Sequence, residues 1–262
     1  MAGGDSLAGF LATLPQEAFA FALILTRVSA AVMLMPGFGM SEIPAMLRAG
    51  IALLVNLVLL PLLAPHMPPA PQDGAATLRL VAAELSAGLW LGLFIQTLAL
   101  ALPVAGEVIS LMTGLSSVIV PDQDFNGSGP GLSRAFSLLI PIFVFATDLH
   151  SLLLSALVSS YDLIPAGQGL PAADGAASFV AIVGESFRLA LRLASPFLFA
   201  GLLWQAGLAL AGRVIRQIPF YFIAMPAQIM GGLVLLAFLL RFLLAAYAAA
   251  MHQDLLAWPA MR

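Results

Sequence analysis

The chain has 262 residues, of which 61% are hydrophobic and only 9% are charged, and its mean hydropathy is +1.05. Because a soluble domain carries about 25% charged residues, this composition excludes an ordinary soluble fold and predicts a polytopic α-helical membrane protein. The net charge of −3 is too small to indicate nucleic acid or another polyanion as a partner, and the absence of cysteine excludes disulfides and thiolate metal sites.

Long apolar segments follow one another along the chain, separated by loops rich in proline and glycine. In order, they are Glu17–Met35, Ala45–Ala64, Thr77–Val120, Leu132–Val158, Ala176–Arg216 and Tyr221–Met251. The third and the fifth are too long for one crossing of a bilayer core about 30 Å thick. Pro103 marks the expected bend in the third. Gly184, Pro196 and Gly201 are expected to interrupt the fifth. The pattern therefore predicts an all-α, membrane-associated fold of long, kinked helical hairpins.

The stretch Leu102–Pro130 has a distinctive pattern in the middle of the chain. Gly106, Ser110 and Gly114 are spaced four residues apart, so on a helix they form one smooth face that another helix or a narrow opening can approach closely. The acidic, glycine-rich segment Pro121–Pro130 follows, and its irregular backbone would lack hydrogen-bond partners in lipid. The sequence therefore predicts a closely packed helix that ends at water or inside a protein assembly.

Charged residues inside the apolar segments are the next clue. Arg27 lies near the middle of the first segment, where an arginine costs roughly 2.5–3.5 kcal/mol on insertion scales, so we expect it to face protein, water or a carboxylate. Glu84 lies next to the helix-packing pair Gly88 and Gly92. Together with Glu107, these charges could form the proton relay of a secondary transporter, although ion pairing between helices is the more frequent outcome.

A second charged group lies in the fifth segment. Glu185, Arg188 and Arg192 are spaced i, i+3 and i+7, so they share one face of a helix. They could form a polar seam or a joint between subunits. Alternatively, the segment could lie in the membrane interface, with the arginine side chains extending to the lipid headgroups. The sequence leaves both interpretations open.

Motifs for enzymatic chemistry are weak or missing. The spacing of His66, His150 and His252 does not match that of metal ligands, and the chain has no glycine loop that would bind a phosphate cofactor. The four residues Gly114-Leu115-Ser116-Ser117 are similar to the GxS element of intramembrane serine proteases, and His150 could then act as the base. This short match makes a hydrolase the weakest hypothesis, and we expect no cofactor, no metal and no catalytic residue.

Short motifs distributed over nearly the whole chain, taken in order, carry a family resemblance. They are Arg27, Pro36-Gly37-Phe38-Gly39, Ile43-Pro44, Arg48, Glu84, Gly88, Gly92, Ala105-Gly106-Glu107, Gly114-Leu115, Pro121-Asp122, Leu149-His150, Ser159-Ser160-Tyr161, Ile164-Pro165-Ala166-Gly167, Leu193-Ala194-Ser195-Pro196, Arg213, Pro219, Pro226 and Gly231-Gly232. Their order and spacing resemble the flagellar biosynthetic protein FliR family. That family includes the export-gate subunit of virulence type III secretion systems. The chain departs from the family pattern at Phe220-Tyr221-Phe222 and at Ala227-Gln228.

The resemblance implies a non-enzymatic subunit of an export gate in the bacterial inner membrane, at the flagellar basal body. Such a subunit assembles with FliP and FliQ homologues, close to FlhB and FlhA homologues, and unfolded exported proteins pass through the centre of the gate. The family also implies a FliP-like part over about 1–160 and a FliQ-like part over about 176–262. The plug of the closed channel maps onto the loop region around Gly106–Ser117. There we expect Val108, Ile109, Leu111 and Met112 to form an apolar seal.

Overall fold

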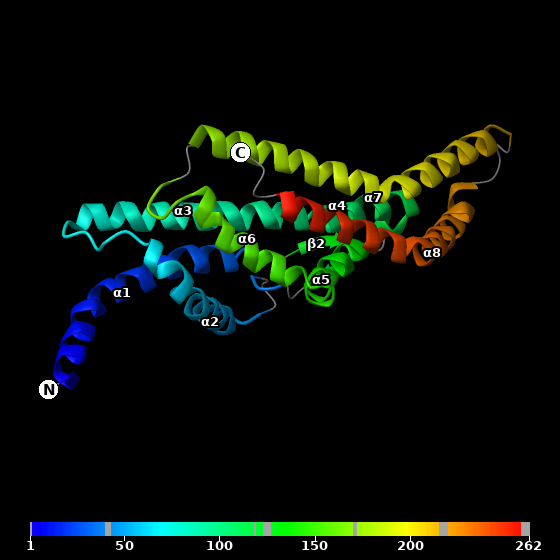
Figure 1. Ribbon diagram of the computed structural model, residues 1–262. Coiled ribbons are helices and arrows are strands. Elements are labelled where there is room, and N and C mark those ends of the chain that lie inside the picture. The colour runs from blue at the N-terminus through cyan, green and yellow to red at the C-terminus, as the bar shows by residue number, and fades with distance from the viewer. Residues whose placement is uncertain are drawn as a thin grey trace. The chain divides into compact units, whose positions relative to one another are not determined.

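The computed structural model describes the backbone of residues 2–39, 43–117, 119–122, 127–169, 172–214 and 220–257, and the side chains of 14–39, 43–116, 131–169, 175–213 and 224–256. This part of the chain is almost entirely helical (Figure 1), which confirms the predicted all-α class. The helices are α1 (Ala2–Val32), α2 (Ala45–Leu63), α3 (Gly74–Ala99), α4 (Ala101–Thr113), α5 (Gly131–Ala146), α6 (Leu149–Leu163), α7 (Ala172–Val214) and α8 (Phe220–Ala257), with single 3-10 turns at η1 (Ala64–His66) and η2 (Leu115–Ser117).

Four stretches of the described chain are long and apolar enough to cross a membrane, and α5 with α6 makes a fifth if the two count as one broken span. The mean hydropathy of the four stretches lies between 1.6 and 2.4. In the most apolar stretch, Ala224–Leu256 within α8, only 11% of the 18-residue segment that meets the hydropathy criterion is buried inside the chain. Surfaces of this kind are covered by lipid or by other subunits, because water does not tolerate large apolar faces.

A short β-hairpin lies in the stretch that follows α4. Strands β1 (Ile119–Asp122) and β2 (Gly127–Pro130) pair antiparallel, with Ile119 opposite Pro130. The expectation of irregular backbone over Pro121–Pro130 is therefore wrong for its described residues. Pairing between the two strands gives this polar segment the backbone hydrogen bonds that an irregular loop would lack. Residues 123–126 lie outside the described part of the chain.

Helix α7 runs through the three positions at which an interruption was expected, so that prediction is wrong. Figure 1 shows α7 as an unbroken ribbon that bends part-way along its length. Pro196 lies inside the helix and cannot donate a hydrogen bond to the carbonyl of Arg192. The hydroxyl of Ser195 donates to that carbonyl instead, at 2.8 Å. This local replacement lets the helix continue beyond the proline.

The breaks that do occur have different causes. The third apolar segment is divided at Leu100, which places Pro103 in the first turn of α4, where its missing N–H would have no partner within the helix in any case. The fourth is divided before Asp148, which has a left-handed backbone (φ 56°, ψ 15°). A left-handed residue cannot continue an α-helix, and aspartate is one of the few side chains that tolerate this conformation.

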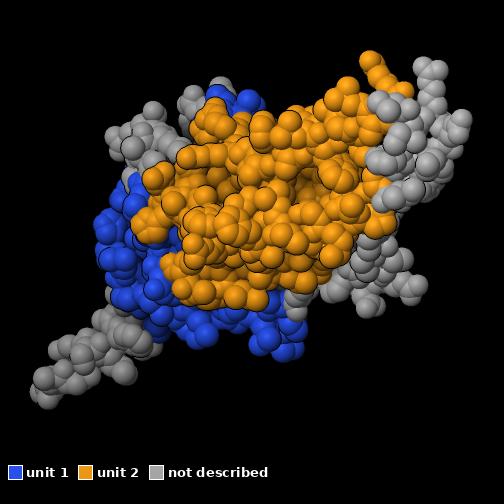
Figure 2. Space-filling model, turned by 90° about the vertical axis from the view of Figure 1, so that its right-hand side faces the viewer, with its two compact units in different colours: residues 1–96, 148–181, 255–262 blue, residues 97–147, 182–254 orange. Residues whose placement is uncertain are grey.

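The chain divides into two compact units, which Figure 2 shows in different colours. Unit 1 comprises residues 1–96, 148–181 and 255–262, and unit 2 comprises residues 97–147 and 182–254. Each unit is therefore assembled from segments that are far apart in the sequence. The core of unit 1 includes buried Leu23, Ile24 and Phe94, and the core of unit 2 includes buried Phe136 and Phe197.

Candidate functional site: a buried ion pair and a seal region

The most concentrated polar site of unit 1 is an ion pair between α1 and α3. The guanidinium of Arg27 donates from Nε to Oε2 of Glu84 at 2.8 Å and from Nη2 to Oε1 at 3.1 Å. Both side chains have 0% exposure to solvent. Two parallel charge-assisted hydrogen bonds are the strongest geometry for an arginine–carboxylate pair. The arginine in the first apolar segment thus faces a carboxylate and not lipid.

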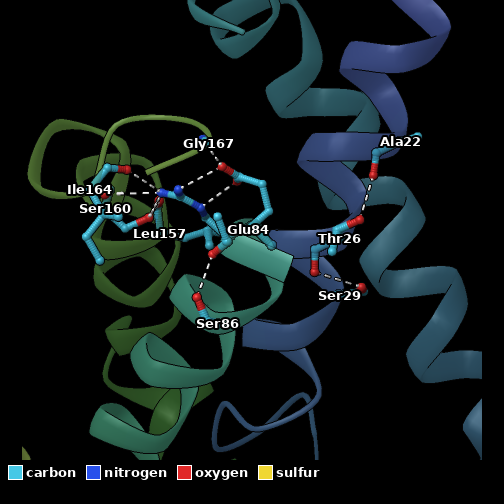
Figure 3. A network of polar contacts seen from close by, with 11 residues as sticks. Ala22, Thr26, Ser29, Glu84, Ser86, Leu157, Ser160, Ile164 and Gly167 are labelled. Atoms are coloured by element: carbon cyan, nitrogen blue, oxygen red, sulfur yellow. Dashed lines mark hydrogen bonds and ion pairs between the residues drawn. The ribbon is translucent and has the colours of Figure 1, made fainter. Parts of the chain in front are cut away.

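Backbone groups near the end of α6 complete this site, which we call the Arg27–Glu84 network (Figure 3). The Nη1 atom of Arg27 donates to the carbonyl oxygens of Ser160 at 3.2 Å and Ile164 at 3.0 Å. The amide of Gly167 donates to Oε1 of Glu84 at 2.8 Å. The network therefore ties α1, α3, α6 and the loop after α6 together, and it satisfies two charges that are not exposed to solvent.

Close helix packing and an aromatic ring surround the network. A Cβ added to Gly88 would lie 2.4 Å from the carbonyl oxygen of Arg27, and one added to Gly92 would lie 2.7 Å from Cβ of Leu34. Real side chains cannot approach that closely, so the contact between α1 and α3 requires glycine at both positions. The Cζ atom of Arg27 lies 3.9 Å from the centre of the Tyr161 ring, a cation–π contact on the face that is not hydrogen-bonded.

The region around Gly106–Ser117, for which the sequence predicts a seal, lies in unit 2, where α4 packs against α5. A Cβ on Gly106 would lie 2.8 Å from the ring of Phe136, and the hydroxyl of Ser133 donates to the carbonyl of Pro103 at 3.0 Å. Gly106, the first residue of the small-residue pattern, therefore lies in a close helix–helix contact. Ser110 is buried as well.

The expected loop around Gly106–Ser117 is wrong for most of its length. Residues up to Thr113 belong to α4, and η2 follows. Gly114 is the C-cap of α4, with a left-handed backbone of φ 77°, so it ends the helix and does not extend the face of Gly106 and Ser110. Glycine suits this position because it enters the left-handed region without steric cost.

The four expected seal residues differ in burial. Ile109 is completely buried in unit 2, whereas Leu111 is 62% exposed. Val108 and Met112 are half-buried. Val108, Leu111 and Met112 are spaced i, i+3 and i+4 and share one side of α4, whereas Ile109 is buried in the core of unit 2. Leu111 is the most exposed of the four, and Ile109 anchors the helix.

The remaining charged candidates belong to unit 2. Glu107 is exposed on α4 in unit 2, and it takes no part in the hydrogen bonds of that network. Arg188 donates to Glu185 on the surface of α7, and their side chains are 72% and 49% exposed. Arg192 is also exposed. The three α7 residues thus lie on an open face.

Comparison with known proteins identifies the family. The family described as bacterial export proteins, family 1, matches residues 18–253. The chain belongs to this family. Flagellar biosynthetic protein FliR of Caulobacter vibrioides is 35% identical over 84% of this chain and 88% of its own length, and FliR of Escherichia coli is 27% identical over 82% of each chain. Yop proteins translocation protein T of Yersinia pestis is 29% identical over 79% of this chain and 80% of its own length. The resemblance predicted from the motifs is confirmed.

Membership of the bacterial export family, together with four or five apolar spans, identifies an integral membrane protein of an export apparatus.

Sequence reasoning missed the carbonyl acceptors of Ser160 and Ile164, because a backbone carbonyl carries no sequence signal. The residues Pro165-Ala166-Gly167 did indicate a turn after the helix, because a glycine at such a position often adopts the left-handed backbone that Gly167 has (φ 79°).

Proposed function

We propose that this chain is a FliR-type subunit of a flagellar type III export gate, a non-enzymatic part of the channel through which unfolded flagellar proteins cross the bacterial inner membrane. The observation that carries the proposal is the 35% identity with a FliR protein over 84% of the chain. The match to a Yop translocation protein is weaker, at 29%, so a virulence export gate is the second candidate. The partners are FliP and FliQ homologues, with FlhB and FlhA homologues close by.

The helix dimensions support a subunit that is partly covered by protein. Helix α7 has 43 residues and is therefore roughly 65 Å long at 1.5 Å per residue. That is about twice the thickness of a bilayer core. Its surface carries exposed Val180, Phe199 and Leu210 along much of this length. Apolar side chains outside the hydrocarbon need a protein neighbour, as they would have in an assembled gate.

The division into a FliP-like part over about 1–160 and a FliQ-like part over about 176–262 belongs to the same proposal. Helices α7 and α8 make up nearly all of the second part, and two long helices joined by a short connection form a hairpin of the kind that stacks side by side in an assembly. In the first part, the Arg27–Glu84 network gives α1, α3 and α6 one fixed arrangement. A subunit that docks among several neighbours needs such an internally rigid body.

Arg27 and Glu84 argue against the alternative of a secondary transporter. A proton relay needs a carboxylate that can exchange protons with a water-filled path. Both oxygens of Glu84 accept charge-assisted or backbone hydrogen bonds, and its side chain is fully buried. Glu84 is therefore better suited to hold helices together than to carry protons. The transporter hypothesis predicts solute flux by the isolated chain, which the export-gate hypothesis does not.

The test is deletion of this chain from its own bacterium, followed by measurement of flagellar protein secretion and of co-purification with tagged FliP and FliQ homologues. We expect secretion to stop and to return when the chain is supplied from a plasmid. We also expect the tagged partners to recover the chain in a stable complex. Normal flagellar secretion with loss of virulence-type secretion would assign the second candidate. A purified chain that transports a solute without partners would overturn both.

A further inference from the structure

The C-terminal end of α4 is held by a side chain from α8. The carbonyl of Met112 is one of the last four of α4, which have no partner within the helix. The side-chain amide of Gln228 donates from Nε2 to this carbonyl at 3.0 Å. Gly114 turns the chain away directly afterwards, and a Cβ at that position would lie 3.6 Å from the amide of Gln228. One glutamine therefore satisfies a terminal carbonyl of α4, which ends at Gly114.

Two glycines, one from α7 and one from α8, face neighbouring residues at the end of α4. A Cβ on Gly201 would lie 3.0 Å from Cβ of Met112, and a Cβ on Gly232 would lie 2.4 Å from Cβ of Thr113. The neighbouring Gly231 has no such contact, with nothing within 4 Å. The end of α4 thus lies against both helices. A larger side chain at position 232 would push it away, whereas a Cβ at position 201 would make a tight contact with Met112.

A hollow lies beside this contact, with a volume of about 300 Å³. Its walls include Met112, Phe197, Trp204, Gln228 and Leu235. The hollow is mostly apolar, and a methionine side chain is flexible enough to fill irregular apolar space. Met112 therefore borders space into which its side chain can move.

We propose that Gln228, Gly201 and Gly232 form a latch that holds the end of α4 and thereby positions Met112 in the closed seal of the channel. The latch rests on the proposed export-gate function. Gln228 is a positioning residue, because it acts on the seal through the backbone of α4. A single hydrogen bond between neutral groups contributes little net stability, so the contact can open and close. The hollow receives the Met112 side chain when the latch is open.

The first test replaces Gln228 by leucine, which has a similar size but no donor. We expect Gln228→Leu to raise ion leakage through the closed gate roughly two- to tenfold, the range that the loss of one hydrogen bond allows. Assembly with FliP and FliQ homologues should be unchanged, which separates a positioning role from a merely structural one. Gln253→Leu, an exposed glutamine of the same helix, is the matched control. Leakage at the wild-type level in an assembled Gln228→Leu gate overturns the latch.

Two adjacent glycines give a second comparison. Gly232→Ala places a methyl group against Thr113, whereas Gly231→Ala meets open space. We expect Gly232→Ala to leak ions at least as much as Gln228→Leu, and Gly231→Ala to behave like the wild type. Equal leakage from the two alanine variants would contradict the role of Gly232 in the latch.

The third test locks the latch. The chain contains no cysteine, so a pair introduced as Met112→Cys with Gly201→Cys has no competing thiol. The 3.0 Å between the two Cβ positions is a few tenths of an ångström below the range found in disulfides, about 3.5–4.5 Å. We expect the oxidised pair to stop secretion, and a reductant to restore secretion in the same cells.

The outcomes of the third test separate the two proposals. A disulfide that forms in the purified chain but leaves secretion unchanged overturns the latch, because the contact then does not need to open. Absence of the disulfide in the purified chain also overturns it, because the contact then does not exist. If the wild-type chain itself does not support secretion in its deletion strain, the proposed function fails, and this result is independent of the cysteine pair.

Discussion

The Arg27–Glu84 network of unit 1 and the latch of unit 2 both hold three helices together, but with opposite chemistry. The network uses two fully buried charges, two charge-assisted hydrogen bonds and further backbone partners. The latch uses one neutral hydrogen bond beside a hollow of about 300 Å³. A buried charge that loses its partner is strongly unfavourable, whereas an amide that loses a carbonyl beside open space is not. We therefore expect the network to stay closed and the latch to open.

The largest expected effect on stability comes from breaking the Arg27–Glu84 network. Arg27→Met leaves the carboxylate of Glu84 buried without its partner, which should destabilise the folded chain by about 3–5 kcal/mol. Thermal unfolding of the purified chain in detergent and its abundance in membranes measure this loss. Arg213→Met, at an exposed arginine of α7, is the control.

The double variant Arg27→Met/Glu84→Leu shows whether charge is the cause. Because it removes both charges, its destabilisation should be well below the sum of the two single variants. A double variant that loses as much as that sum would mean that shape, and not charge, holds the network together. The Arg27–Glu84 network would then be closer in character to the latch of unit 2 than we infer.

The second prediction concerns the glycine contact that supports the network. Gly88→Ala puts a methyl group 2.4 Å from the carbonyl of Arg27, which should cost about 1–3 kcal/mol by forcing α1 and α3 apart. Gly184→Ala meets nothing within 4 Å and should stabilise α7 by up to about 1 kcal/mol, because alanine is the better helix former. Denaturant unfolding of both variants measures these opposite signs. If Gly88→Ala stabilised the chain as Gly184→Ala does, this result would show that α1 and α3 separate easily.

Part of the network could be predicted from sequence, for a physical reason. An arginine within an apolar segment is costly in lipid, so Arg27 had to find a carboxylate or water. The sequence could not choose between Glu84 and Glu107, because both lie in the same long segment. It also could not show that Ser160 and Ile164 would supply carbonyls to Arg27, since every residue has a carbonyl. The two residues lie more than 130 positions from Arg27 in the chain.

The latch was less accessible to sequence reasoning. The small residues around Gly114 indicated a close approach, but they did not indicate which helix approaches. Gly201 looked like a helix interruption and is instead a contact with Met112. Gln228 was noted only as a departure from the family pattern. Contacts between distant segments depend on how the helices pack, and a single sequence carries no direct record of that packing.

The third prediction tests the expected seal residues of α4, the helix whose end the latch holds. Leu111→Ala, alone and combined with Met112→Ala, should increase ion leakage through the closed gate, because smaller side chains admit water to an apolar constriction. Leu111 is exposed in the isolated chain, so the single variant should change the free energy of unfolding by less than about 0.5 kcal/mol. Leu210→Ala, at a similarly exposed leucine of α7, is the control. Unchanged leakage and unchanged secretion in both seal variants would remove these residues from the seal.

The smallest expected effect on stability concerns the exposed ion pair of Glu185 and Arg188 on α7. Pairs of this kind contribute only about 0.2–0.5 kcal/mol to a helix, so Arg188→Glu should unfold almost like the wild type. If α7 meets another subunit at this face, the same change should lower co-purification with the FliP or FliQ homologue. The swap Glu185→Arg/Arg188→Glu restores the pair within the helix but not the pattern presented to a partner, so co-purification should stay low. Normal assembly of both variants would favour arginines that extend to the lipid headgroups.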